Sequence, residues 1–242
     1  MERYGIGRTD VGLVRENNED SYFVSNTEVG KLHNVYVVAD GMGGHQAGEV
    51  ASAAAIQHFC AYLQANMYST QYTEALLADA VKDANNKVFE LSLQDMSKQG
   101  MGTTFSACCF DENNLYYAHV GDSRIYLLSH GELKQLTTDH TYVEEMIAKG
   151  LMTEEEAEHS LNRHMLTRAL GTEYGIEVDA GYTPLTEGDV VLICSDGLTN
   201  MLTDEEIASI LNGIVELETK ADELVTRALQ NGGHDNVTIV LL

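Results

Sequence analysis

The run VYVVADG (residues 35–41) is apolar and strand-like, and it stops at an aspartate followed by glycine. The same arrangement occurs in YYAHVGD (116–122) and VVLICSDG (190–197), and in reverse order in DNVTIV (235–240). Because strands of this composition are buried, their polar ends mark the rim of a sheet. Carboxylates gathered at one rim repel each other and resist ionisation unless a cation lies among them. We therefore expect a divalent-metal site and a metal-dependent hydrolase, with the ligands Asp40, Asp122, Asp196 and Asp235.

The rest of the chain is predicted to form strands and helices in layers. Apolar runs predict strands over 4–12, 19–25, 33–40, 176–183, 189–195 and 236–242, and three or four short strands within 103–136. Apolar residues at three- and four-residue intervals predict helices over about 46–66, 72–98, 204–211 and 216–231. In the first helix, the expected buried stripe is Val50, Ala53, Ile56, Cys60 and Leu63.

Short turns join the successive strands, so the sheets should be antiparallel. Each helix has one apolar stripe and the helices come in pairs, which two stacked sheets can accommodate on their outer faces. We predict an α+β fold: an αββα sandwich of two stacked antiparallel β-sheets flanked by helix pairs on both outer faces. No linker or repeat divides the chain, so residues 1–242 should form a single domain, with a polar, helix-prone insert at about 139–168.

Charge and cysteine content limit the location and the partners. The chain has 38 acidic residues against 14 Lys and Arg, and its net charge of -24 disfavours nucleic acid and anionic lipid as partners. Cys60, Cys108, Cys109 and Cys194 lie in apolar stretches, which is typical of core thiols in a reducing compartment. The first residues lack a long apolar run, and no stretch of ~18 apolar residues occurs. We expect a cytoplasmic protein without direct membrane contact.

Oxygen ligands favour Mg²⁺ or Mn²⁺ over zinc, which prefers histidine and cysteine. Gly41 lacks a side chain, so its backbone carbonyl can approach a metal closely. Two metals that share a bridging carboxylate hold a water and lower its pKa, and the resulting hydroxide can attack phosphorus directly. In agreement, the chain has no Cys-x5-Arg cradle, no Gly-x-Ser-x-Gly elbow and no Asp-x-Asp-x-Thr motif.

A phosphate group also needs a cationic partner, and arginine is the usual choice. Arg15 opens the polar run RENNED (15–20), where it has no core role. A surface ion pair with Glu16 or Glu19 explains this arginine equally well, so phosphate binding by Arg15 is a hypothesis.

Six segments in a fixed order point to a family. They are VRENNEDS (14–21), VADGMGGH (38–45), MGTT (101–104), VGDSR (120–124), CSDGL (194–198) and GHDNVT (233–238). Together they resemble the bacterial metal-dependent serine/threonine protein phosphatases of type 2C, and they extend over residues 14–238. This resemblance implies an αββα sandwich with the metals in a cleft at one rim of the sheets.

The resemblance also implies a role for each metal ligand. Asp40 would bridge the first two Mn²⁺ or Mg²⁺ ions, and the carbonyl of Gly41 would bind the second. Asp196 and Asp235 would bind the first ion, and a possible third, looser ion would lie between Asp122 and Asp196.

Other residues receive roles from the same resemblance. Arg15 would grip the substrate phosphate, while Asp20 and Glu19 would act on the metals through bound water. His45 lies near the start of a helix and could protonate the leaving alkoxide, because an unperturbed histidine titrates near neutrality. A solvated helix-start histidine is the alternative. The insert at 139–168 resembles the family's mobile flap, although an ordinary helical hairpin would have the same sequence pattern.

The implied activity is hydrolysis of phosphoserine and phosphothreonine in proteins, opposing a bacterial Ser/Thr kinase. The expected partners are phosphorylated proteins, including such a kinase, and we expect a monomer. Two other functions stay open. One is a sensor that keeps the fold without turnover, although every metal carboxylate is present. The other is a phosphatase for phosphotyrosine or small esters, because a metal hydroxide does not discriminate among these. A calcium module is disfavoured, since the carboxylates are scattered along the chain.

Overall fold

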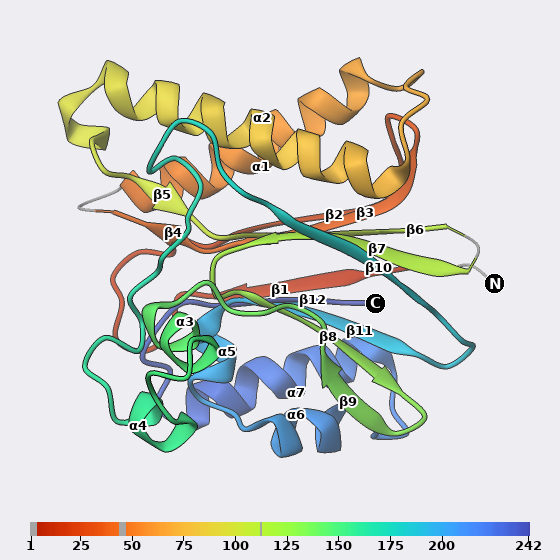
Figure 1. The fold of residues 1–242 in the computed structure, drawn as a ribbon. Helices are drawn as coiled ribbons and strands as arrows, with labels where there is room; N and C mark the ends of the chain where they lie inside the picture. Colours follow the sequence, from red (N-terminus) through yellow and green to blue (C-terminus); the bar gives the residue numbers. More distant parts are fainter. Residues whose placement is uncertain (1–3, 44–46, 112) are drawn as a thin grey trace.

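The computed structural model describes residues 4–43, 47–111 and 113–242, and these form two stacked five-stranded sheets (Figure 1). The first sheet has the order β1 (Ile6–Asp10), β12 (Val237–Leu241), β11 (Val190–Cys194), β8 (Arg124–Ser129), β9 (Glu132–Gln135). The second has the order β10 (Asp179–Pro184), β7 (Asn114–Val120), β6 (Phe105–Phe110), β3 (Leu32–Ala39), β2 (Ser21–Val29). A short ribbon joins β4 (Gly41–Met42) to β5 (Gly102–Thr103).

Every strand pair is antiparallel, as the short connecting turns predict. The helices α1 (Ala47–Ala65) and α2 (Thr73–Gln94) cover the outer face of the second sheet, and the short 3-10 helix η1 (Met96–Lys98) follows α2. The outer face of the first sheet is covered by α6 (Asp204–Leu211) and α7 (Leu217–Gln230), beside the short α5 (Asp196–Thr199) (Figure 1). The predicted αββα sandwich is confirmed.

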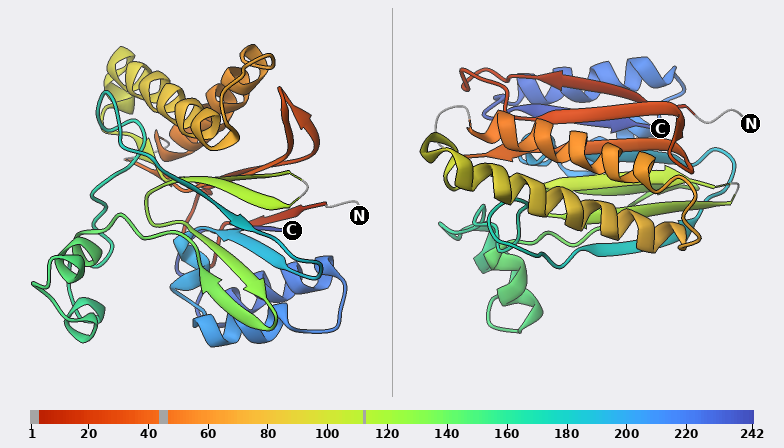
Figure 2. Two further views of the ribbon diagram at one scale, coloured as in Figure 1. Left: turned by 45° about the vertical axis from the view of Figure 1, so that its right-hand side comes forward. Right: turned by 90° about the horizontal axis from the view of Figure 1, so that it is seen from above.

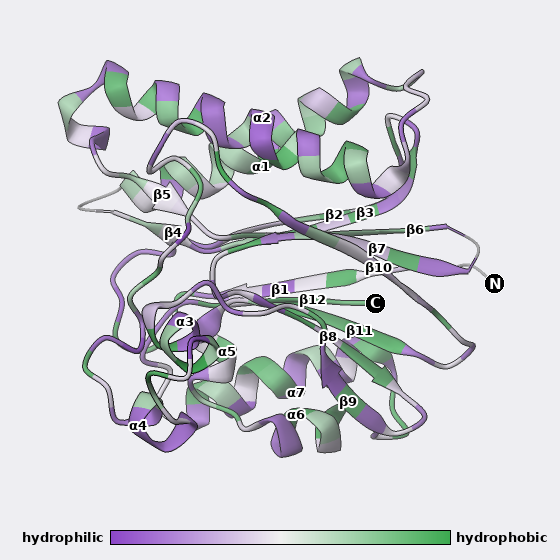
Figure 3. Ribbon diagram, viewed as in Figure 1, coloured by the Kyte–Doolittle hydropathy of each residue, from purple (hydrophilic) through white to green (hydrophobic). Residues whose placement is uncertain are grey.

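Three apolar layers hold this sandwich together, and hydrophobic residues concentrate between its layers (Figure 3). The layer between the sheets contains Tyr36, Cys108, Ile125 and Ile193, all fully buried. Strand β3 contributes to two layers, because Val35 and Val37 face α1 and α2 while Tyr36 and Val38 face the other sheet. A strand buried on both faces reads as a continuous apolar run, which explains the sequence from residue 35 to 39.

The buried face of α1 differs from the predicted stripe. Ala51, Ala55, Phe59 and Leu63 are fully buried, whereas Ala53 is exposed and Val50 is half-buried. Alanines occur at four of the five positions from 51 to 55, so several faces of this helix are apolar and its phase is not fixed by the sequence. Cys60 is half-buried on the same helix and is not a full member of the core.

The insert forms α3 (Tyr142–Ala148) and α4 (Glu154–Glu158), which project from one end of the sandwich (Figure 2). Thr141 caps α3 by accepting from the Glu144 N–H, and Thr153 and Glu156 form a reciprocal capping box on α4. Among the described residues, no helix is long and apolar enough to cross a membrane.

Candidate active site

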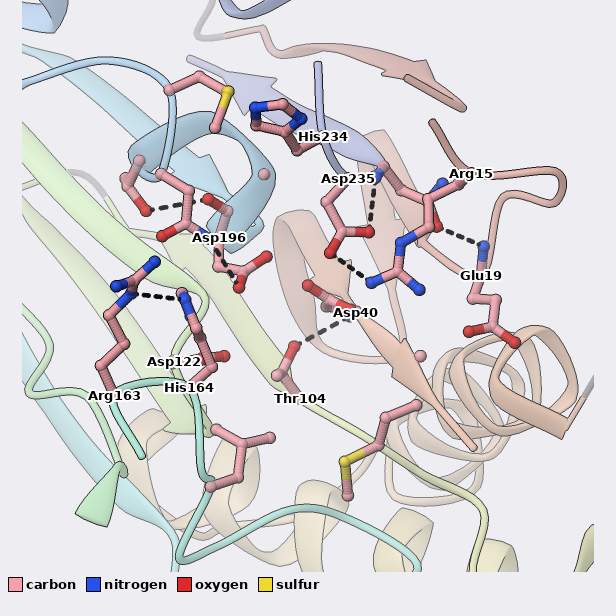
Figure 4. A pocket seen from close by; sticks show the side chains of 18 of the residues that line it. Arg15, Glu19, Asp40, Thr104, Asp122, Arg163, His164, Asp196, His234 and Asp235 are labelled. Carbon is pink, nitrogen blue, oxygen red and sulfur yellow. Dashed lines mark hydrogen bonds and ion pairs between the residues drawn. The ribbon is translucent and has the colours of Figure 1, made fainter. Parts of the chain in front are cut away.

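The four predicted metal carboxylates meet at one rim of the sandwich. Asp40 follows β3, Asp122 lies in the turn from β7 to β8, Asp196 begins α5 directly after β11, and Asp235 lies two residues before β12. All four line a single cleft of about 850 Å³, together with Gly41 and Arg15 (Figure 4). The antiparallel topology produces this convergence, since the strand ends that carry these residues face the same way.

Further residues of the cleft were not singled out as functional from the sequence. Among them are Thr104, Arg163, His164, Asn200, Met201 and His234. Thr104 and His234 belong to the quoted motifs MGTT and GHDNVT, which gave a signal that went unused. Arg163 and His164 come from the insert, where the Arg163 Nε–H donates to the His164 ring at 2.8 Å (Figure 4). No motif marked those two residues.

Backbone bonds fix the loop that carries Asp40. Its N–H donates to Thr104 Oγ1 at 2.9 Å, and its carbonyl accepts from Thr103 Oγ1 and the Thr104 N–H, both at 2.9 Å. Thr104 Oγ1 also lies 2.6 Å from Ser123 Oγ, next to Asp122. The loops of two predicted ligands are therefore held together by one threonine.

Asp20 lies buried beside the cleft, with 8% of its surface exposed. Its Oδ2 accepts from Ser195 Oγ at 2.8 Å, and Ser195 in turn accepts from the Thr238 N–H at 3.0 Å. Among the described residues, the Asp20 Oδ1 atom is the buried side-chain oxygen or nitrogen that has no hydrogen-bond partner. A buried carboxylate oxygen without a partner is costly, so this atom is an acceptor available to a cation or its water.

Arg15 reaches into the cleft from the β1–β2 loop. Its Nη2 donates to Asp235 Oδ2 at 2.7 Å, and its side chain is 52% exposed. The sequence analysis considered Glu16 or Glu19 as the ion-pair partner of Arg15, and the structure shows Asp235 instead. The bond with Asp235 raises the pKa of Arg15.

The carboxylates of the cleft oppose each other's ionisation. Burial and the neighbouring Asp196 and Asp235 charges raise the pKa of Asp20 to about 7. Burial and the Asp196 charge raise the pKa of Asp122 to about 8. The pKa of Asp40 is raised well above its ordinary value by burial and by the surrounding aspartates, and the pKa of Asp196 is raised by burial and Asp235. A positive charge in the cleft would remove this conflict.

The residues present fit hard divalent cations. The four predicted carboxylates supply oxygen ligands, which suit Mg²⁺ and Mn²⁺, and His164 and His234 also line the cleft. Gly41 is required for close packing, because a methyl group there would collide with the backbone carbonyl oxygens of Gly48 and Glu19. Within the described ranges, no three acidic, histidine or cysteine side chains form a compact ligand set by themselves. The carboxylates border the cleft, and water would complete the coordination of ions held there, as is usual for magnesium.

The described ranges do not include His45, so its proposed role as general acid falls outside the structure. Glu19 lines the cleft as expected, and burial raises its pKa.

An oxygen-rich cleft at the rim of an αββα sandwich defines a metal-dependent hydrolase. Residues 14–231 match the family model of protein phosphatase 2C. The chain is 38% identical over 237 residues to the serine/threonine phosphatase stp of Listeria monocytogenes serotype 4b, covering 97% of this chain and 93% of the relative.

Solved structures agree with the sequence match. The Mycobacterium tuberculosis serine/threonine phosphatase PstP/Ppp superposes with a TM-score of 0.87 at 38% identity, covering 98% of this chain and 96% of that one. The catalytic domain of PstP in complex with two manganese ions has a TM-score of 0.82 at the same identity and coverage.

The chain belongs to the protein phosphatase 2C family. Membership confirms the predicted family, the predicted enzyme class and the dependence on Mn²⁺ or Mg²⁺ that characterises the family.

Proposed function

We propose that this chain removes phosphate from phosphoserine and phosphothreonine residues of proteins in a reaction that requires Mn²⁺ or Mg²⁺. The observation that carries the proposal is the convergence of Asp40, Asp122, Asp196 and Asp235 on one cleft, with the partnerless Asp20 oxygen beside it. Its relatives named serine/threonine phosphatase support the substrate class.

The carboxylates and one backbone carbonyl would hold the metals. Asp40 would bridge two ions, the Gly41 carbonyl would bind one of them, and Asp196 and Asp235 would bind the other. A third ion would lie between Asp122 and Asp196. Asp20 would act through water, which agrees with its place beneath the lining of the cleft. When bound, the metals supply an activated water for attack on phosphorus.

Arg15 would bind the substrate phosphate. Its guanidinium lies in the cleft and is half-exposed, and its bond to Asp235 fixes where it points. A fixed guanidinium can form two parallel hydrogen bonds to a phosphate, which orients the ester for attack. His45 remains the proposed general acid for the leaving alkoxide.

The insert at 139–168 would serve as a flap on a single catalytic domain of residues 1–242. Arg163 and His164 reach the cleft from it, so a movement of the insert would change the shape and charge of the substrate entrance (Figure 4). A net charge of -24 repels acidic proteins at long range, and phosphoproteins with basic residues near the phosphate are therefore the preferred substrates in this proposal. We further propose a cytoplasmic monomer that opposes a Ser/Thr kinase.

The test is hydrolysis of a phosphothreonine peptide and a matched phosphotyrosine peptide by the wild type and Asp196→Ala, with Mn²⁺ and after EDTA. The proposal predicts phosphothreonine turnover that needs Mn²⁺ and is lost in the variant. Faster turnover of phosphotyrosine would overturn the substrate class, and activity that survives EDTA would overturn the metal mechanism. A folded wild type without activity would favour the sensor function.

A further inference from the structure

The insert begins at a reciprocal pair of hydrogen bonds next to a proposed metal ligand. The His140 backbone N–H donates to the Gly121 carbonyl at 2.7 Å, and the Gly121 N–H donates to Nδ1 of the His140 ring at 3.0 Å. Gly121 directly precedes Asp122. The first turn of the insert and the Asp122 loop are therefore joined by a closed ring of hydrogen bonds that passes through one imidazole.

The His140 ring is held in one tautomer by its partners. Nδ1 accepts from the Gly121 N–H, so the proton of the neutral ring lies on Nε2, which is 3.2 Å from Asp179 Oδ2 and 3.3 Å from Arg168 Nη1. Asp179 also accepts from Arg168 Nη1 at 2.9 Å. A neutral imidazole with its proton on Nε2 accepts from Gly121 and donates to Asp179, while Arg168 Nη1 makes its shorter bond to the same Asp179 carboxylate. A proton on Nδ1 would face the Gly121 N–H.

His140 is buried among closely packed side chains. Its surface is 4% exposed, and its ring packs at a tilt of 36° against the fully buried His119, with the ring centroids 4.9 Å apart. Beside it, the Arg124 guanidinium donates to both carboxylate oxygens of Asp139, and the Nη2–Oδ2 distance is 2.7 Å. A buried residue so closely surrounded cannot replace its hydrogen bonds with water.

Gly121 is confined on its other side as well. It has a φ of +109°, and a methyl group there would meet Thr104 at 2.6 Å. Thr104 also bonds to Asp40, as described above. The peptide that leads into Asp122 is thus held between Thr104 and the His140 ring, and the ring is the part contributed by the insert.

We infer that His140 is a positioning residue. Its Nδ1 atom holds the Gly121 N–H, and this bond couples the position of the insert to the orientation of the Asp122 carboxylate. This inference rests on the proposed role of Asp122 in metal binding. It does not require His140 to touch metal or substrate, and it separates His140 from the insert residues that line the cleft.

Three substitutions test the role of Nδ1. His140→Asn places an oxygen close to the position of Nδ1, so it keeps an acceptor for Gly121. His140→Gln carries its amide further out, toward Asp179, and leaves the Gly121 N–H without a partner. His159→Ala is the control, since His159 is an exposed residue of the same insert.

The first measurement needs no metal. Hydrogen exchange at the Gly121 amide, followed in EDTA, should be about tenfold faster in His140→Gln than in the wild type, because one hydrogen bond is lost. His140→Asn should stay near the wild-type rate, and His159→Ala should match it. Equal exchange in the asparagine and glutamine variants would overturn the inference. Both variants are compared at matched helical signal by circular dichroism.

The second measurement is the Mn²⁺ concentration for half-maximal hydrolysis of p-nitrophenyl phosphate. We expect it to rise about tenfold in His140→Gln, with the KM for the ester nearly unchanged, and to return toward the wild-type value in His140→Asn. If the glutamine variant does not fold, His140→Ala, which also lacks an acceptor for Gly121, takes its place in both measurements. An unchanged Mn²⁺ requirement in a folded glutamine variant would refute the coupling. A wild type that does not require Mn²⁺ would instead refute the proposed function, and the inference with it.

Discussion

Removal of one buried charge should stabilise the metal-free protein. Asp20 is buried, one of its oxygens has no partner, and its pKa is raised to about 7 by burial and by the charges of Asp196 and Asp235. Above that pKa the folded protein must ionise a carboxyl that the unfolded chain ionises easily. We therefore predict that Asp20→Asn increases the free energy of unfolding in EDTA.

The size of the predicted stabilisation follows from the pKa shift of Asp20. An increase from 3.8 to about 7 corresponds to roughly 4 kcal/mol at pH 8 and to roughly 2 kcal/mol at pH 5. The sign follows from proton binding: between the two pKa values the folded state holds the proton more tightly, so the wild type loses stability as the pH rises. The new amide brings a buried N–H₂ group without an acceptor, which costs about 1–3 kcal/mol at both pH values. The net gain at pH 8 is then about 1–3 kcal/mol, larger than at pH 5 by roughly 2 kcal/mol.

The assay is urea unfolding in EDTA at pH 8 and pH 5, for wild type, Asp20→Asn and the control Glu132→Gln, which removes an exposed charge from strand β9. The difference between variant and wild type should grow with pH for Asp20→Asn and stay flat for the control. A gain of the same size at both pH values would refute the argument that the Asp20 charge destabilises the fold. With saturating Mn²⁺ the free energy of unfolding of the wild type should increase, because bound metal stabilises the folded state.

Arg15→Ala should raise the KM for a phosphopeptide about tenfold, with Arg15→Lys intermediate, because lysine lacks the planar fork; steady-state kinetics at saturating Mn²⁺ checks this, and an unchanged KM would exclude Arg15 as the phosphate ligand. The pKa of His119 is lowered to about 3, mainly by burial, so His119 should make the fold lose roughly 2 kcal/mol between pH 7 and pH 5; urea unfolding of His119→Asn should lack this loss, and the same loss in that variant would contradict it. Gly41→Ala should lower stability by about 3 kcal/mol, because the methyl group has no space; a thermal melt in EDTA that equals the wild type would contradict that packing.

Much of the fold was predictable because its elements have unambiguous periods. The apolar runs at 35–39 and 190–194 were predicted as buried strands, and the helix predicted over 204–211 is α6. The buried face of α1 was predicted only in part: Ile56 and Leu63 are buried as predicted, but Ala53 is exposed, because alanines make several faces of the helix apolar. Pattern can fix a helix's phase only when one face is polar.

Some residues of the candidate site could be predicted from the local sequence, and others could not. Aspartates at strand ends were found from the sequence, since burial makes the position of a strand end clear. The orphan oxygen of Asp20, the Arg15–Asp235 ion pair and the contact between His140 and Gly121 depend on residues distant in the chain. The last two join residues 220 and 19 positions apart. No local pattern encodes such pairings. For the same reason, the sequence did not predict that Arg163 and His164 of the insert line the cleft.

The central claim is that the rim carboxylates bind the catalytic metals, and calorimetric titration of Mn²⁺ into metal-free protein tests it most directly. The wild type should bind about two ions tightly, and Asp40→Asn should lose this binding while its circular dichroism spectrum stays that of the folded protein. Tight binding of the same stoichiometry in Asp40→Asn, or none in the folded wild type, would contradict the account.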